Sequence, residues 1–185
     1  MPRFDKLLVL DLDETLVYAT DEFAELPEPS DDDFIVGPYL VRPRPGASAF
    51  LARCLEWFEV GVWTASTRDY ARPVLHWLVE LERLSFLWGR ERCTWRTDME
   101  TREGYWIKDI KKLRRRGYAR SRIIVVDDTP RKLERSYGNL VRARAFFGAL
   151  DDRHLGELLP YLESLGELAD VRRVEKRGWS NAPSG

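Results

Sequence analysis

The sequence is poor in the residues that cross-link a small protein or carry it across a membrane. Its 185 residues include only two cysteines and two histidines. Cys54 and Cys93 form no C-x-x-C pair, so we expect neither a disulfide scaffold nor a zinc site, and a reducing compartment fits. No apolar run approaches the roughly 20 residues that span a membrane. The N-terminal segment has no small-residue cleavage site, which predicts no signal peptide and a cytoplasmic location, or a nuclear one in a eukaryote.

Composition and charge indicate one globular unit. Hydrophobic residues make up 44% of the chain and charged residues 33%, which excludes a disordered protein. We expect a single domain at 1–176 and a flexible tail at 177–185. The net charge of −1 conceals an acidic run at 21–33 and a basic run at 111–122. Such runs are usually solvated faces, although a basic surface beside a phosphate site would attract anionic substrates.

The most informative segment lies near the N-terminus. Four apolar residues at 7–10 predict a buried strand of a parallel sheet, and Asp11 and Asp13 follow it directly. Residues two apart on a strand point to the same face, so the two carboxylates would meet unless the strand geometry ends first. Such a pair needs a cation or a proton to offset its repulsion. From this segment alone, a divalent-metal site and a pair of solvated acids fit equally well.

Short apolar runs alternate with helical periodicity along the rest of the chain. We expect strands at 34–36 and 39–41, forming a hairpin, and at 58–63, 85–88, 122–126 and 139–142. We expect helices at 47–57, 69–82, from 130 to about 137, and at 152–165, a short basic helix or loop at 109–116, a loop at 18–33 and a small β insertion at 89–107. This alternation predicts a Rossmann-like, doubly wound parallel sheet with helices on both faces.

In such folds the ligand lies outside the carboxyl ends of the strands, and here those ends carry polar residues. Two acidic pairs, a hydroxyl and a lysine meeting at one edge are much harder to explain by accident than one polar strand end. Each residue type matches a need of phosphoryl transfer, in which charge must be offset while a phosphoryl group moves. The set comprises Asp11, Asp13, Thr64, Lys108, Asp127 and Asp128.

The acids suit the chemistry itself. Asp11 would attack phosphorus and form an aspartyl-phosphate. A Mg²⁺ ion held by Asp11, the backbone carbonyl of Asp13 and Asp127 would bridge to the phosphate. The Asp13 carboxyl group would protonate the leaving oxygen and then activate water.

The remaining residues suit phosphate binding. The hydroxyl of Thr64 and the ammonium of Lys108 would hold phosphate oxygens, although a threonine at a strand-to-helix turn is often only a helix cap. Asp128 would bind the metal through water or orient Lys108, and the sequence does not choose between these roles.

Four segments carry a resemblance to a known family: DLDETLV at 11–17, WTAS at 63–66, Lys108, and VVDDTP at 125–130. They resemble the four motifs of the haloacid-dehalogenase superfamily. More closely, the chain is similar to the small phosphatases that act on the RNA polymerase II carboxy-terminal domain, including the Nuclear-LIM-interactor-interacting-factor type. The similarity runs from residue 7 to about residue 165.

The resemblance implies a Mg²⁺-dependent phosphoprotein phosphatase with a Rossmann-like core and no large cap domain. It implies the roles given above for the catalytic acids and the phosphate ligands. By matching position, it adds Arg90 as a phosphate or substrate contact, although a surface arginine without a role is an alternative. Asp128 and Thr129 depart from the eukaryotic pattern, which usually has Asn and often Ser there.

An open site without a lid suits a phosphorylated macromolecule, so we expect a phosphoserine or phosphothreonine protein as the partner and no membrane. The alternatives are a phosphatase of nucleic-acid 3′ or 5′ ends, a small-metabolite phosphatase and a receiver-type signalling domain. A receiver would not need Asp13 as an acid and base.

Among the tryptophans, we expect Trp63, Trp77 and Trp88 in the core, while Trp95 and Trp106 either pack there or line a substrate groove. The oligomeric state is left open.

Overall fold

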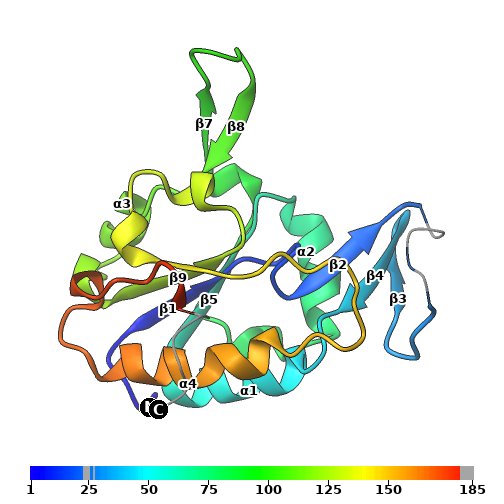
Figure 1. The fold of residues 1–185 in the computed structure, drawn as a ribbon, viewed down its shortest axis with the longest axis horizontal. Helices are drawn as coiled ribbons and strands as arrows, with labels where there is room; N and C mark the ends of the chain where they lie inside the picture. Colours follow the sequence, from blue (N-terminus) through cyan, green and yellow to red (C-terminus); the bar gives the residue numbers. More distant parts are fainter. Residues whose placement is uncertain (23–25, 27, 180–185) are drawn as a thin grey trace.

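The computed structural model describes residues 1–22, 26 and 28–179. Its centre is a five-stranded sheet in the order β10-β9-β1-β5-β6, in which every neighbouring pair is parallel (Figure 1). The predicted parallel sheet is therefore confirmed. Its strands are β1 (Leu7–Leu10), β5 (Glu59–Trp63), β6 (Phe86–Trp88), β9 (Ile123–Asp127) and β10 (Leu140–Arg142).

Strand β1 lies in the middle of this sheet because its side chains are apolar in both directions. All four of its residues are buried. Leu8 and Leu10 belong to the larger core cluster on one face of the sheet, and Leu7 and Val9 belong to the cluster on the other. A strand buried on both faces requires such a continuous apolar run.

Helices cover both faces of the sheet. Residues of α1 (Ala47–Trp57), α2 (Arg68–His76) and α4 (His154–Glu167) join the larger core cluster, and α1 and α4 lie side by side (Figure 1). The short α3 (Lys111–Arg114) contributes Leu113 to the opposite cluster. None of the helices in the described part of the chain is long and apolar enough to cross a membrane.

Two small antiparallel sheets flank the carboxyl edge of the central sheet. One has the order β2-β4-β3, and the other is the β7–β8 hairpin, which projects away from the body of the domain (Figure 1). The predicted β insertion at 89–107 is confirmed by this hairpin, and no large cap domain occurs among the described residues. The strands of these two small sheets are β2 (Val17–Thr20), β3 (Phe34–Val36), β4 (Tyr39–Pro43), β7 (Thr94–Thr97) and β8 (Gly104–Ile107).

Three predicted segments differ from the structure. The predicted loop at 18–33 begins with β2, which pairs with β4, while its residues 23–25 and 27 lie outside the described part of the chain. The helix predicted at 69–82 ends at His76, and a separate 3₁₀ turn follows at Leu81–Arg83. The helix predicted from 130 is a single 3₁₀ turn, Pro130–Leu133.

The shortened helix after Pro130 has a tertiary cause. The side-chain amide of Asn139 donates to the backbone carbonyls of Arg120 and Ile123, both at 2.7 Å, which ties the chain beside β9. Ser136 takes an extended φ of −153° on the way there, so a continued helix is excluded.

The tryptophans divide between core and surface. Trp63 and Trp88 are buried, as predicted. Trp77 is 65% exposed and stacks on Phe34 instead, so the prediction of a core position was wrong for it. In the predicted tail, Trp179 donates its indole N–H to the carbonyl of Arg142 at 2.8 Å, and residues 180–185 lie outside the described part of the chain.

Candidate active site

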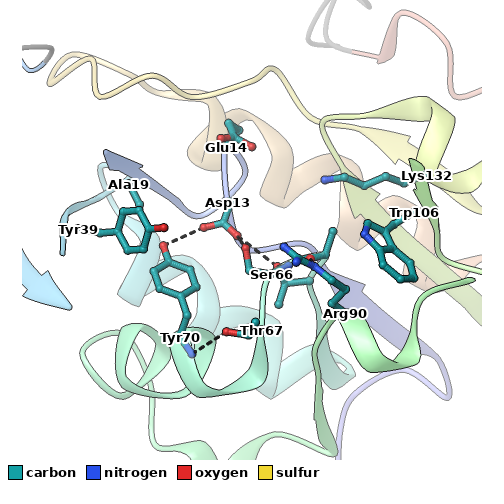
Figure 2. Close-up of a pocket in the computed structure, with 12 residues that line it drawn as sticks. Asp13, Glu14, Ala19, Tyr39, Ser66, Thr67, Tyr70, Arg90, Trp106 and Lys132 are labelled. Carbon is teal, nitrogen blue, oxygen red and sulfur yellow. Dashed lines mark hydrogen bonds between the residues drawn. The ribbon is translucent and has the colours of Figure 1, made fainter. Parts of the chain in front are cut away.

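The sheet brings the predicted site residues to one edge. The backbone N–H of Asp11 donates to the carbonyl of Val126 at 2.9 Å, which continues the β1–β9 ladder and places Asp11 beside Asp127. Thr64 follows β5, the other neighbour of β1. At this edge a cavity of about 440 Å³ opens to the surface, and Figure 2 shows the residues around it.

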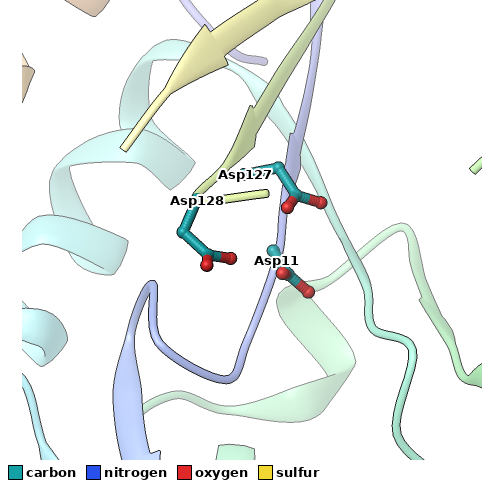
Figure 3. A group of neighbouring side chains, drawn as sticks. All are labelled: Asp11, Asp127 and Asp128. Carbon is teal, nitrogen blue, oxygen red and sulfur yellow. The ribbon is translucent and has the colours of Figure 1, made fainter. Parts of the chain in front are cut away.

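Asp11, Asp127 and Asp128 form an acidic cluster (Figure 3). One carboxylate oxygen of each lies within 4.8 Å of the others, and Asp11 and Asp127 are buried. Oδ1 of Asp128 is also buried and accepts no hydrogen bond from any described residue. Buried carboxylates this close repel one another unless positive charge offsets them. Clustered carboxylate oxygens, one of them without a hydrogen-bond donor among the described residues, fit a hard divalent cation, which prefers oxygen ligands.

Two lysine side chains contact this acidic cluster. The ammonium of Lys108 lies 2.7 Å from Oδ1 of Asp11 and 2.6 Å from Oδ2 of Asp127. The ammonium of Lys132 donates to Oδ2 of Asp11 at 2.7 Å. Burial alone would raise the pKa of Asp11, but the two ammonium groups outweigh it and hold that pKa below its ordinary value. Asp11 is therefore ionised at neutral pH, as a nucleophile must be.

Asp13 occupies a different environment, turned away from the acidic cluster toward hydroxyl groups. Its Oδ2 accepts from the hydroxyls of Ser66 at 2.7 Å and Thr64 at 3.2 Å, and its Oδ1 accepts from the phenol of Tyr70 at 2.9 Å (Figure 2). Burial raises the pKa of Asp13 despite these donors. Two carboxyl groups two residues apart thus have pKa values shifted in opposite directions, which is the pattern of a nucleophile and an acid.

The hydroxyl donors are held in place by the start of α2. The backbone N–H of Ser66 donates to Oγ1 of Thr64 at 2.9 Å, which fixes the turn after β5. Thr67, rather than Thr64, caps α2 by accepting from the N–H of Tyr70. The hydroxyl of Thr64 is therefore left to the site.

The rim of the cavity carries further charged groups. Glu14 lines it at a left-handed φ of 56°, and burial, followed by the charges of Asp13 and Asp128, raises its pKa to about 7. Arg90 also lines the cavity, and its Nε donates to the carbonyl of Ala65 at 2.7 Å. This bond aims the guanidinium along the cavity wall.

A buried arginine supports the loop that carries the acids. Arg44 is fully buried, forms an ion pair with Asp152 at 2.8 Å and donates to the carbonyl of Thr15 at 3.2 Å. Its backbone N–H also donates to the carbonyl of Leu16 at 2.8 Å. The turn after Asp13 is thereby fixed from behind.

The structure thus brings together all the predicted site residues, but with changes in their neighbours. Lys108 faces the acidic cluster instead of lining the open cavity, and Asp128 faces Lys132 at 3.6 Å rather than Lys108. Trp106 lines the cavity, as one of its two predicted alternatives required. Part of the basic run lines a separate cavity of about 420 Å³ that includes Arg135.

Sequence reasoning missed four residues of the site. Lys132 follows Asp128 by four residues, a spacing that brings side chains together on a helical turn, and this was the available signal. Ser66 and Tyr70 are hydroxyl residues just after a strand end, which is too common a pattern to single them out. Glu14 is part of the first motif and was assigned no role.

The comparison with protein families decides the family. The model of the NLI interacting factor-like phosphatases matches residues 6–172, nearly the whole chain. The chain belongs to the NLI interacting factor-like phosphatase family. This confirms the resemblance that the four motifs suggested.

Curated relatives agree with this membership. A probable C-terminal domain small phosphatase of Dictyostelium discoideum is 34% identical over 172 residues, which cover 91% of this chain and 53% of the relative. The human carboxy-terminal domain RNA polymerase II polypeptide A small phosphatase 1 is 32% identical over 174 residues, covering 92% of this chain and 63% of the relative. This family domain therefore spans only about half to two thirds of the length of these relatives.

Solved structures support the same fold. A variant of the fission yeast RNA polymerase II CTD phosphatase Fcp1, bound to beryllium fluoride, superposes with a TM-score of 0.55 at 19% identity. The match covers 91% of this chain and 52% of that protein. At this identity the likeness establishes the shared architecture of this family domain.

Proposed function

We propose that this domain is a Mg²⁺-dependent phosphatase that removes phosphate from phosphoserine or phosphothreonine of a protein through an aspartyl-phosphate intermediate. One observation carries the proposal: the ionised carboxylate of Asp11, in an acidic cluster, is two residues along the chain from a separately held carboxyl group that lines the cavity. Asp11 belongs to the cluster, and Asp13 is held by hydroxyl groups two residues away. Family membership supports the same chemistry.

Asp11, Asp127 and Asp128 would hold the metal, together with the backbone carbonyl of Asp13. Their clustered carboxylate oxygens, which include the Oδ1 of Asp128 that has no hydrogen-bond donor among the described residues, are the ligand type that Mg²⁺ prefers. When bound, the ion supplies positive charge that offsets the negative charge of the phosphate and of the acids around it.

The first step transfers the phosphoryl group to the protein. A carboxylate oxygen of Asp11 attacks phosphorus, and the bond from phosphorus to the ester oxygen breaks. The carboxyl group of Asp13 donates its proton to that oxygen, so the product leaves as an alcohol. The raised pKa of Asp13 suits this role because it increases the protonated fraction near neutral pH.

The second step releases phosphate. The Asp13 carboxylate, now deprotonated, accepts a proton from a water molecule as its oxygen attacks phosphorus. The bond between phosphorus and the Asp11 oxygen breaks, which restores both acids for the next cycle. The hydroxyls of Ser66 and Tyr70 keep the Asp13 carboxyl group in one orientation during both steps.

The preference for a protein substrate rests on two considerations. The relatives' names refer to phosphatases of the RNA polymerase II carboxy-terminal domain, a phosphorylated protein segment. The cavity also opens between two projecting elements, the β2-β4-β3 sheet and the β7–β8 hairpin, with Tyr39 on one wall and Trp106 on the other. An open groove of this kind accommodates an extended peptide on either side of a phosphorylated residue.

The test is an assay on parallel substrates in the presence of Mg²⁺. We expect release of phosphate from p-nitrophenyl phosphate and from phosphoserine and phosphothreonine peptides, and little from 3′- or 5′-phosphorylated oligonucleotides or a metabolite panel. The Asp11→Asn substitution should abolish phosphate release. The control substitution Asp151→Asn, at an exposed acid on a surface turn, should leave phosphate release unchanged. Full activity of Asp11→Asn would overturn the mechanism. Salt-sensitive activity on oligonucleotides alone would overturn the substrate class.

A further inference from the structure

Among the residues that the structure describes, Lys132 is the one cation that faces both the acidic cluster and the open cavity. Its ammonium lies 2.7 Å from Asp11, 3.5 Å from Asp127 and 3.6 Å from Asp128. These are the same three carboxylates whose oxygens form the candidate metal cluster. Lys132 also lines the cavity, and Figure 2 shows its side chain extended into the space that Arg90 and Asp13 face.

The two lysines of the site differ in how firmly they are held. The side chain of Lys108 is 1% exposed and contacts Asp11 and Asp127 at 2.7 and 2.6 Å. The side chain of Lys132 is 17% exposed, and two of its three carboxylate contacts exceed 3.4 Å. The backbone N–H of Lys108 donates to the carbonyl of Lys132 at 2.7 Å, so the backbones are fixed together and only the side chains differ in freedom.

A divalent ion and the Lys132 ammonium would compete for the same oxygens. Both are cations, and the ion carries twice the charge, so binding of the ion would displace the less tightly held ammonium. Lys132 has a long flexible stem beside an open cavity, and a short rotation of that stem carries its ammonium toward the substrate side. There it faces the space bounded by Thr64 and Arg90, where a phosphate would lie.

We propose that Lys132 is a phosphate ligand that exchanges places with the metal: it neutralises Asp11, Asp127 and Asp128 before the ion binds, and contacts the phosphate of a phosphomonoester afterwards. This rests on the proposed function, since it assumes a phosphate beside Asp11. After the exchange, the ion offsets the charge of the three carboxylates, and the Lys132 ammonium is free to offset the negative charge of the substrate phosphate.

Two binding measurements on Lys132→Met test the exchange. Mg²⁺ titrated calorimetrically into metal-free protein should bind about tenfold more tightly to the variant, because a competing cation is gone. Orthophosphate titrated into Mg²⁺-saturated protein should bind about tenfold more weakly, because a charge-assisted hydrogen bond is lost. A residue that merely supports the fold would weaken both, so the opposite signs identify the exchange.

Control variants keep the result interpretable. Lys111→Met, at an exposed lysine of α3, should leave both affinities at the wild-type values. Lys132→Arg retains the charge and should stay closer to wild type in both titrations. Lys132→Gln replaces the methionine variant if thermal unfolding shows that the latter is not folded.

The outcomes separate this proposal from the proposed function. Unchanged or weaker Mg²⁺ binding in Lys132→Met, or unchanged orthophosphate binding, would overturn the exchange. Neither titration requires turnover. If both behave as expected and the wild-type protein hydrolyses no phosphomonoester, the proposed function fails while the exchange at Lys132 stands.

Discussion

Replacing Tyr70 by phenylalanine removes one oxygen atom and tests whether Asp13 is the proton carrier. The phenol donates to Oδ1 of Asp13 at 2.9 Å, opposite the two hydroxyls on Oδ2. Burial, followed by the nearby charge of Asp13, raises the pKa of Tyr70, so the phenol keeps its proton and remains a donor. The ring of Tyr70 also packs edge-on against Tyr39, and phenylalanine preserves that contact.

The magnitude follows from the kind of bond that is lost. A hydrogen bond to a charged group contributes about 1.5–3 kcal/mol, and the phenol favours the ionised form of Asp13. Its loss should raise the pKa of Asp13 by about one unit, since one unit corresponds to about 1.4 kcal/mol. The looser carboxyl group should also lower the rate about tenfold with substrates whose leaving oxygen needs a proton.

The assay is the pH dependence of kcat/KM with a phosphoserine peptide. An acid must be protonated to act, so activity is lost as pH rises through its pKa, and a raised pKa moves that loss to higher pH. Tyr70→Phe should therefore be slower at its optimum, with the alkaline limb displaced upward by about one unit. With p-nitrophenyl phosphate, whose leaving group needs no proton, kcat/KM of Tyr70→Phe should stay close to the wild-type value.

The matched control is Tyr118→Phe, which removes a phenol that donates to Glu59 outside the site. That variant should retain the wild-type pH profile. An alkaline limb that stays in place in Tyr70→Phe, or an equal loss of rate with both substrates, would refute the assignment of Asp13 as the acid.

Two further predictions concern stability. Burial, followed by the charges of Arg44 and Arg144, lowers the pKa of His154 to about 4, so below pH 6.5 the unfolded chain binds a proton that the folded protein does not. The free energy of unfolding should fall by about 2 kcal/mol between pH 6.5 and 4, allowing for solvent screening. The His154→Gln variant should show a smaller change of Tm over this pH range. Arg44→Met leaves Asp152 and the Thr15 carbonyl without their partner and should cost about 3–5 kcal/mol in urea unfolding, whereas loss below 1 kcal/mol would contradict the supporting role.

The sequence predicted which candidate residues would meet at one edge of the sheet where strand ends define that edge. Asp11, Thr64 and Asp127 come directly after or at the end of three neighbouring strands, and parallel strands place their carboxyl ends at one edge. Their convergence followed from local apolar runs and one topological rule. The predicted strands of the central sheet were correct for the same reason.

What the sequence could not supply depends on long-range contacts. Lys132 is 121 residues from Asp11, and only the turn after β9 brings its ammonium to that carboxylate. The orientation of Asp13 toward hydroxyls, away from Asp127, depends on the turn that Arg44 holds. Strand β2 was predicted as a loop because its pairing partner β4 lies beyond a polar, proline-containing stretch.

The central claim is that Asp11 carries the phosphoryl group, and trapping it on the protein tests this most directly. In Asp13→Asn, p-nitrophenyl phosphate can still phosphorylate Asp11 because its leaving group needs no acid, but no carboxylate remains to activate water. After acid quenching, mass spectrometry should find one phosphoryl group on the peptide that contains Asp11, and none in the Asp11→Asn, Asp13→Asn double variant. A burst of p-nitrophenol without a phosphoryl group on Asp11 would contradict the claim.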